Sequence, residues 1–279
     1  MRENDGSVRF LYSTFIGRLF LKLIMKTHAD RLIVKYLRSP LSRPLISMYA
    51  KRHDIPLTKT ELESFRTYRD FFVRKRGHAA IDTSPDHLIS PCDGWLSAYP
   101  VNENSSFAIK GSRYRVSDLL QDDTLAKNYD GGLCLVFRLC ASDYHHYCYI
   151  DNGYQGKNHY IPGVLHSVQP IACANYPVYT LNRRSWCLMT TENFGPVVQT
   201  EIGALIVGGI SNNRENIRVI RGNEKGHFEL AGSTIVLLFE PGRVRLLQRY
   251  ETCLTEGREM RVYQGAWIAV GSHTENQYD

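Results

Sequence analysis

From about Ile81 onward, glycine, proline and short apolar runs punctuate the chain at intervals of roughly ten residues. Such spacing leaves no room for long helices and is typical of strands joined by turns. The run Gly132–Leu139 and the run Ile235–Phe239, which is closed by Pro241 and Gly242, are the clearest candidate strands. We therefore expect residues 78–279 to form a compact β-rich domain, in a protein of the α+β class.

The first part of the chain has helical character instead. Residues 8–25 read VRFLYSTFIGRLFLKLIM, which is too charged for a membrane span. Arg18, Lys22 and Lys26 recur at every fourth position and therefore line one side of a helix. The apolar residues Phe20, Leu21 and Ile24 are expected on the other side. Such a helix suits the membrane interface, and the alternative is a helix packed on the protein's own core with a solvated basic edge.

A second helix is expected after Thr58, because Thr58 and Glu61 have the spacing of a capping box. Its apolar face continues to Phe72, and the basic residues 74–76 stand at its end before Gly77. We interpret residues 1–77 as a helical, membrane-associating region that precedes the β-rich domain.

Composition narrows the class of protein. The formal net charge of +6 favours binding to an anionic partner surface. Seven cysteines, an odd number without paired spacing, indicate a reducing compartment rather than a disulfide framework. The chain has neither a CxxC nor an HExxH pattern, so no metal site is predicted. The acidic residues Glu3 and Asp5 and the lack of a cleavage pattern argue against a secretory signal.

Ser233 stands at the mouth of the predicted strand Ile235–Phe239 and follows Gly232. Glycine leaves space beside its carbonyl group, and the nearest carbonyl that an activated Ser233 hydroxyl can reach is that of Gly232. Attack there would convert the peptide bond to an ester. The alternative is that Gly-Ser-Thr is only a turn before a strand.

Two further segments carry candidate chemistry. Asp93 lies in a turn of sequence Ser-Pro-Cys-Asp-Gly, where aspartate commonly serves the turn geometry alone. His145 and His146 follow the strand Gly132–Leu139 and, being adjacent on an extended chain, point to opposite faces. The inward set is therefore either Asp143, His145 and Tyr147 or Tyr144, His146 and Cys148.

Several segments, in order along the chain, resemble motifs of the phosphatidylserine decarboxylases. They are Tyr68–Arg74, Pro91–Gly94, Asp143–His145, Tyr160–Pro170, Val197–Ile210 and Phe228–Thr234. The resemblance implies that the chain cuts itself between Gly232 and Ser233, and that Ser233 becomes a covalent pyruvoyl group. It also implies that Asp93 is the acid of the charge relay for self-cleavage and that His145 serves decarboxylation.

The chain departs from the family motif at two positions. His146 stands at the position of an arginine, and Cys148 stands at that of the histidine that acts as the relay base. We therefore hypothesise that His166 lies on a neighbouring strand and fills the space of the missing imidazole. The alternative is that His166 is a buried histidine whose ring is merely hydrogen-bonded.

The resemblance predicts a lyase that converts phosphatidylserine to phosphatidylethanolamine and carbon dioxide. Expected partners are phosphatidylserine, an anionic membrane surface at the cytoplasmic face, and the fragments 1–232 and 233–279 as a heterodimer. No nucleic acid partner and no external cofactor are expected, and a homo-oligomer stays open. The alternatives are an uncleaved, non-catalytic lipid-binding relative, because of Cys148, and a pyruvoyl decarboxylase of another amine.

Overall fold

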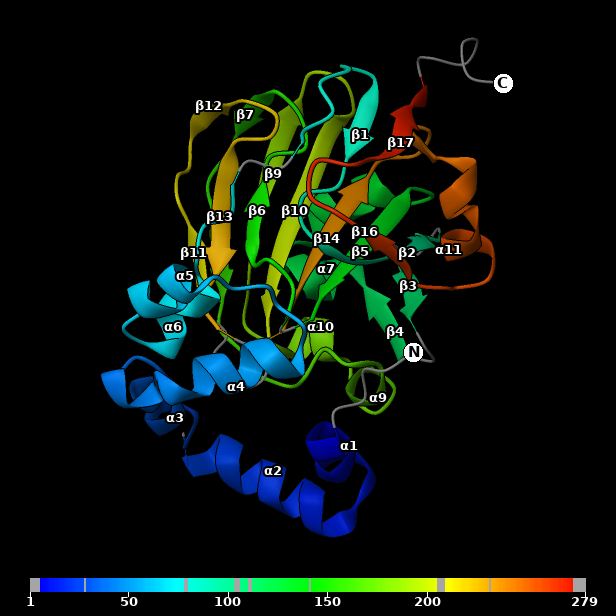
Figure 1. The fold of residues 1–279 in the computed structure, drawn as a ribbon. Helices are drawn as coiled ribbons and strands as arrows, with labels where there is room; N and C mark the ends of the chain where they lie inside the picture. Colours follow the sequence, from blue (N-terminus) through cyan, green and yellow to red (C-terminus); the bar gives the residue numbers. More distant parts are fainter. Residues whose placement is uncertain are drawn as a thin grey trace.

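The computed structural model describes residues 6–27, 29–77, 80–102, 106–109, 112–140, 142–204, 209–230 and 232–272. Helices dominate up to Phe72 and strands dominate from His87, so the expected α+β class is confirmed. In Figure 1 the N-terminal helices gather below one end of the strands. After residue 80, every described helix has five residues or fewer.

The described part of the N-terminal region contains seven helices. They are α1 (Gly6–Ser13), α2 (Phe15–Thr27), α3 (Ala29–Leu37), η1 (Pro40–Ser42), α4 (Pro44–Arg52), α5 (Lys59–Ser64) and α6 (Tyr68–Phe72). The Thr58 capping box is present and starts α5 as predicted. The expectation of one continuous helix from there to Gly77 is wrong. Thr67 and Asp70 form a second capping box, which ends the first helix early and starts α6.

The main sheet has nine strands, and its pairings are antiparallel. Its order is β12 (Ile217–Val219), β7 (Gly153–Gln155), β9 (Arg184–Thr191), β10 (Gly195–Gly203), β14 (Ser233–Phe239), β5 (Leu133–Leu139), β2 (Gly94–Pro100) and β16 (Met260–Val262), with β8 (His159–Ile161) also paired to β9. The predicted strands at 132–139 and 235–239 are therefore β5 and β14, which pair with each other at the centre of this sheet.

Three smaller sheets make up the rest of the β structure that the described residues form. One contains β11 (Ile210–Asn212), β13 (Glu224–Phe228) and β6 (His146–Cys148), another β1 (His87–Ile89), β17 (Trp267–Gly271) and β15 (Val244–Leu246), and the third β3 (Ser106–Ile109) and β4 (Ser112–Arg115). The remaining helices are α7 (Val116–Leu120), α8 (Asp123–Ala126), η2 (Lys127–Tyr129), α9 (Pro170–Cys173), α10 (Val178–Leu181), η3 (Gln248–Tyr250) and α11 (Glu251–Thr255).

Strand β14 is buried along its whole length because both of its faces are covered. Val236 and Leu238 join one hydrophobic cluster, which includes side chains of the N-terminal helices. Ile235 and Leu237 join a second cluster, which includes side chains of β6 and β13. A strand that is covered on both faces has a continuously apolar sequence, and the sequence of β14 is of this kind from Ile235 to Phe239.

Helix α2 packs on the protein by Leu21, which is 1% exposed. The apolar set of this helix was expected to face either a membrane interface or the protein's own core, and Leu21 takes the second position. The outward apolar side chains are instead Phe15, Ile16, Leu19, Phe20 and Leu23, each more than half exposed. Among the described residues, no helix combines the length and the apolar character that crossing a membrane requires.

Candidate active site

Ser233 is the first residue of β14 and lies between the ends of two neighbouring strands. Its register partners are Leu139 at the end of β5 and Gly203 at the end of β10. The residue is 1% exposed, so the hydroxyl is shielded from water. At Gly232 a β-carbon would come within 3.3 Å of the Leu139 carbonyl oxygen, which makes glycine the residue that fits most easily there.

His145 contacts the Ser233 hydroxyl directly. The distance from His145 Nδ1 to Ser233 Oγ is 3.2 Å, and His145 Nε2 lies 2.9 Å from the Cys140 carbonyl oxygen. A carbonyl oxygen only accepts hydrogen bonds, so Nε2 carries the proton and Nδ1 presents a lone pair to the serine. Burial lowers the pKa of His145 to about 3, which keeps the ring neutral. This is the geometry of a general base facing a nucleophile.

The base is enclosed by two aromatic rings. The Phe72 ring lies 4.3 Å from the His145 ring between centroids, and Phe228 meets it edge-on at 6.3 Å. Phe72 belongs to the Tyr68–Arg74 segment, whose chemistry alone suggested nothing more than an amphipathic helix. The structure shows that α6 places this side chain against the imidazole, where it helps to exclude water.

The loop that holds His145 is itself anchored by Asp143. One carboxylate oxygen of Asp143 accepts a hydrogen bond from the Cys140 backbone N–H at 2.7 Å, and the other pairs with Arg261 at 2.7 Å. Burial raises the pKa of Asp143, and Arg261 opposes that shift. Of the two inward sets that strand alternation left open, the first contains the residue that contacts Ser233, namely His145, while Asp143 and Tyr147 make other contacts. Arg261 and Cys140 were missed, since no local pattern marks either residue.

Asp93 is buried but engages an arginine rather than a histidine. Its two oxygens face Arg76 Nη1 and Nη2 at 2.5 and 3.1 Å, and the Gln264 N–H donates to it at 2.9 Å. In the described part of the chain, no hydrogen bond joins Asp93 to His145. The relay role that the resemblance implied for Asp93 thus has no direct counterpart in this geometry.

Cys148 lies on β6 and is 1% exposed. Burial raises the pKa of its thiol to about 12, so the thiol stays protonated and is a poor base. Its sulfur lies 3.9 Å from the Ser90 carbonyl oxygen. The residue therefore behaves as a small buried side chain at the position where the family motif has a histidine.

His166 does not lie on a strand, contrary to our hypothesis, but in the irregular segment between β8 and α9. Its Nδ1 is 3.1 Å from the Tyr12 hydroxyl oxygen, and its ring stacks on Tyr176 at 4.6 Å. Among the contacts of the described residues, none joins His166 to Ser233 or Cys148. Its neighbour Val168 is the residue that approaches Gly232, within 3.6 Å of where a β-carbon would lie.

The Tyr12 hydroxyl provides a hydrogen-bond partner for one ring nitrogen of the buried His166. It accepts a hydrogen bond from the Ser167 backbone N–H at 2.9 Å, so its own proton points to His166 Nδ1. The contact therefore requires an unprotonated Nδ1, and burial lowers the pKa of His166 accordingly. It attaches α1 to the β-rich part of the molecule.

Comparisons with known proteins agree with the motifs. The family model described as phosphatidylserine decarboxylase matches residues 68–269. The chain is 37% identical over 268 residues to phosphatidylserine decarboxylase proenzyme 2 of Clostridium acetobutylicum, covering 95% of this chain and 91% of that protein. It is 36% identical to the phosphatidylserine decarboxylase proenzymes of Clostridium botulinum strain Hall, over 94% of this chain and 92% of the relative, and of Ruminiclostridium cellulolyticum, over 92% and 89%. The chain belongs to the phosphatidylserine decarboxylase family.

Proposed function

We propose that this protein is a self-processing decarboxylase that converts phosphatidylserine to phosphatidylethanolamine and carbon dioxide. Membership of the family supports the reaction class and the substrate. The observation that carries the processing step is the 3.2 Å contact between His145 Nδ1 and Ser233 Oγ. It gives the chain a general base although Cys148 occupies the position of the family's relay histidine.

Self-cleavage follows from this contact in balanced steps. His145 Nδ1 takes the Ser233 hydroxyl proton, Oγ attacks the Gly232 carbonyl carbon, and the C–N bond breaks as the amine of Ser233 receives that proton. The resulting ester loses the α-proton of residue 233, and its Cβ–O bond breaks. Residues 1–232 then end in a carboxylate and residue 233 becomes dehydroalanine. Tautomerisation and hydrolysis release ammonia and leave a ketone on residue 233.

The residues around Ser233 fit a pyruvoyl group at that position. No additional binding residues are needed, since the group is made from Ser233 itself, which is already enclosed next to His145. When formed, the pyruvoyl ketone supplies an electron sink for decarboxylation. His145 stays beside residue 233, where its ring is placed to position the carboxylate group of the substrate. Phe72 and Phe228 keep water away from this ring.

The exposed side chains of helix α2 support contact with a lipid surface, and we place that surface at the cytoplasmic face as part of the proposal. Its exposed apolar side chains lie on the face opposite buried Leu21. Arg18 and Lys22 lie along the edge of this apolar face and are exposed. An apolar face flanked by basic residues binds at the boundary between headgroups and acyl chains.

The test is the covalent state of the purified chain. Denaturing electrophoresis should show fragments 1–232 and 233–279. Mass spectrometry should find that the smaller fragment has no free amino terminus and begins with a ketone. The Ser233→Ala variant should remain one band. Vesicles containing phosphatidylserine should yield phosphatidylethanolamine, and free serine should yield no product. A wild-type chain that stays whole would refute the proposal, and turnover of free serine would assign the enzyme to another amine substrate.

A further inference from the structure

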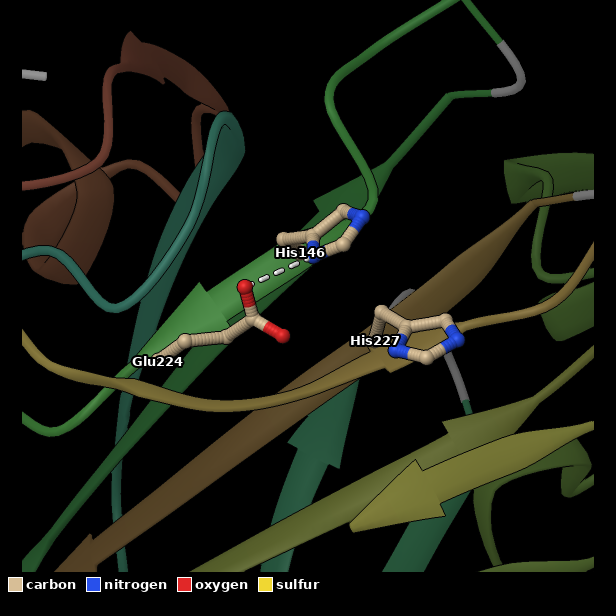
Figure 2. Close-up of side chains that lie close together, drawn as sticks. All are labelled: His146, Glu224 and His227. Atoms are coloured by element: carbon tan, nitrogen blue, oxygen red, sulfur yellow. Dashed lines mark ion pairs between the residues drawn. The ribbon is translucent and has the colours of Figure 1, made fainter. Parts of the chain in front are cut away.

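His146, Glu224 and His227 converge on the face of the strand pair β6–β13. His146 and His227 are opposite each other in register. The nitrogen and oxygen ligand atoms of the three residues all lie within 4.8 Å of one another. Figure 2 shows the two imidazole rings and the carboxylate gathered round one point. The proposed self-cleavage uses none of these three side chains.

An irregularity in β13 makes this convergence possible. Glu224 and His227 are three residues apart, so in a regular strand their side chains would point to opposite faces. The register shifts between Glu224 and Gly226, where the strand departs from a regular ladder. A bulge of this kind re-aims a side chain and is often found beside functional sites.

The hydrogen bonding of His146 turns one buried ring nitrogen toward Glu224. Its Nε2 lies 3.0 Å from the Val73 carbonyl oxygen and must therefore carry a proton. In the neutral ring Nδ1 then holds a lone pair, which faces a Glu224 carboxylate oxygen at 3.1 Å. Nδ1 is buried, and Glu224 is its polar neighbour among the described residues; His227 Nδ1 is also buried and makes no hydrogen bond in that part of the chain. The His146 side chain is 4% exposed.

We propose that His146, Glu224 and His227 bind one divalent transition-metal ion, of which zinc is the representative. In the neutral ring, the lone pair of His146 Nδ1 and the Glu224 carboxylate oxygen repel each other. A cation bound between them and His227 turns this repulsion into two attractive contacts. Two nitrogen ligands and one oxygen ligand suit zinc and its first-row neighbours, whereas magnesium and calcium prefer all-oxygen sites. The site would keep an open coordination position, since the protein provides three ligands.

The groups around the ligands are those that a metal site requires. The Val73 carbonyl orients the His146 ring by accepting from Nε2. The Asn213 amide donates to one oxygen of Glu224 at 3.2 Å and leaves the other oxygen for the ion. The rings of Tyr144 and His227 stack on His146 at 4.9 Å each, which restricts the rotation of the imidazole.

Among the described residues, Lys75 is a cation that competes for Glu224. Lys75 Nζ lies 3.6 Å from the Glu224 oxygen that faces His146. The Lys75 side chain is 77% exposed, so it can move into solvent when an ion binds. Exposed pairs of this type contribute little to stability, and losing this one opposes metal binding only weakly. The Glu224 side chain is 30% exposed and gives the ion a route from solvent.

The decisive measurement is zinc binding by the full-length chain in the Ser233→Ala background, where processing plays no part in the readout. After chelator treatment and its removal, calorimetry with zinc chloride should show one equivalent bound, and cobalt should give a visible absorption band. His227→Gln and Glu224→Gln should each weaken binding by at least about tenfold. His159→Gln, which removes a histidine ring stacked on Trp186, is the matched control and should bind as its parent does.

Two results would overturn the proposal. Equal zinc affinity in the parent, His227→Gln and Glu224→Gln would place binding elsewhere on the surface. If the parent binds no equivalent of zinc, and if metal-free Glu224→Gln unfolds at a lower temperature than the metal-free parent, then Glu224 pairs with a protonated His146 instead of a metal ion. Since Ser233→Ala cannot form a ketone, neither result depends on whether the wild-type chain processes itself.

Discussion

Replacing His145 by glutamine should nearly stop self-cleavage. Glutamine leaves a hydrogen-bond acceptor near Ser233 but cannot take up its proton. General-base catalysis contributes about 10²–10⁴-fold, or about 2.7–5.4 kcal/mol of activation free energy. We expect the upper part of this range, because His145 is fully buried and Ser233 is 1% exposed, so water has poor access to serve as a substitute base.

The rate of cutting can be followed on freshly synthesised chain. Samples from cell-free translation are quenched in denaturant at intervals, and the 279-residue chain is quantified against fragment 1–232. Thermal unfolding of His145→Gln is compared with that of Ser233→Ala, which is also uncut. Similar unfolding temperatures show that His145→Gln has folded and that the lost cleavage reflects lost chemistry.

His166→Gln is the matched control, because it also removes a buried imidazole but one that contacts Tyr12 rather than Ser233. It should cut at close to the wild-type rate. If His145→Gln cuts normally while His166→Gln stays whole, the assignment of the base from this geometry is wrong and the hypothesis drawn from the sequence is right.

Three further predictions concern the surroundings of the site. Phe72→Ala should lower the free energy of unfolding in urea by about 3–5 kcal/mol, since it empties a buried aromatic position against His145. As the pH falls from 7 to 5, the folded chain should lose stability, because burial lowers the pKa of His166 below its ordinary value of 6.5 and the unfolded chain takes up the proton first. The unfolding temperature of His166→Gln should therefore fall less over this pH range than that of the wild type. Phe15→Ser with Leu19→Ser should weaken flotation with phosphatidylserine vesicles by about 100-fold, at roughly 1.5 kcal/mol per lost apolar side chain, without changing the unfolding temperature.

The features that could be predicted from the sequence are those that depend on neighbouring residues. The apolar run of β14 and the placement of Ser233 at its start follow from local composition and turn signals. The Thr58 capping box follows in the same way. The role of Gly232 could also be predicted, because it concerns only the peptide bond between Gly232 and Ser233.

The features that were missed depend on long-range packing or on departures from regular geometry. Residues 72 and 145 meet only because α6 folds back on the sheet, and no periodicity encodes that contact. The metal candidate was missed because its ligands come from two strands and because the irregularity after Glu224 changes the side-chain alternation. His166 was misplaced because its environment is set by Tyr12, more than 150 residues away in the sequence.

The predicted division at residue 77 is crossed by contacts that the site itself uses. Phe72 packs on His145, the Val73 carbonyl holds His146, and Arg76 pairs with Asp93. These three residues end the helical region; His145 contacts Ser233, and His146 is a proposed ligand of the ion. We therefore expect a truncated chain of residues 78–279 to leave the His145 ring open to water, Asp93 without its arginine and Ser233 uncut. That outcome would make the helical region part of the catalytic apparatus as well as the proposed attachment to a lipid surface. The segment Tyr68–Arg74 would then serve the site, since Phe72 and Val73 contact His145 and His146.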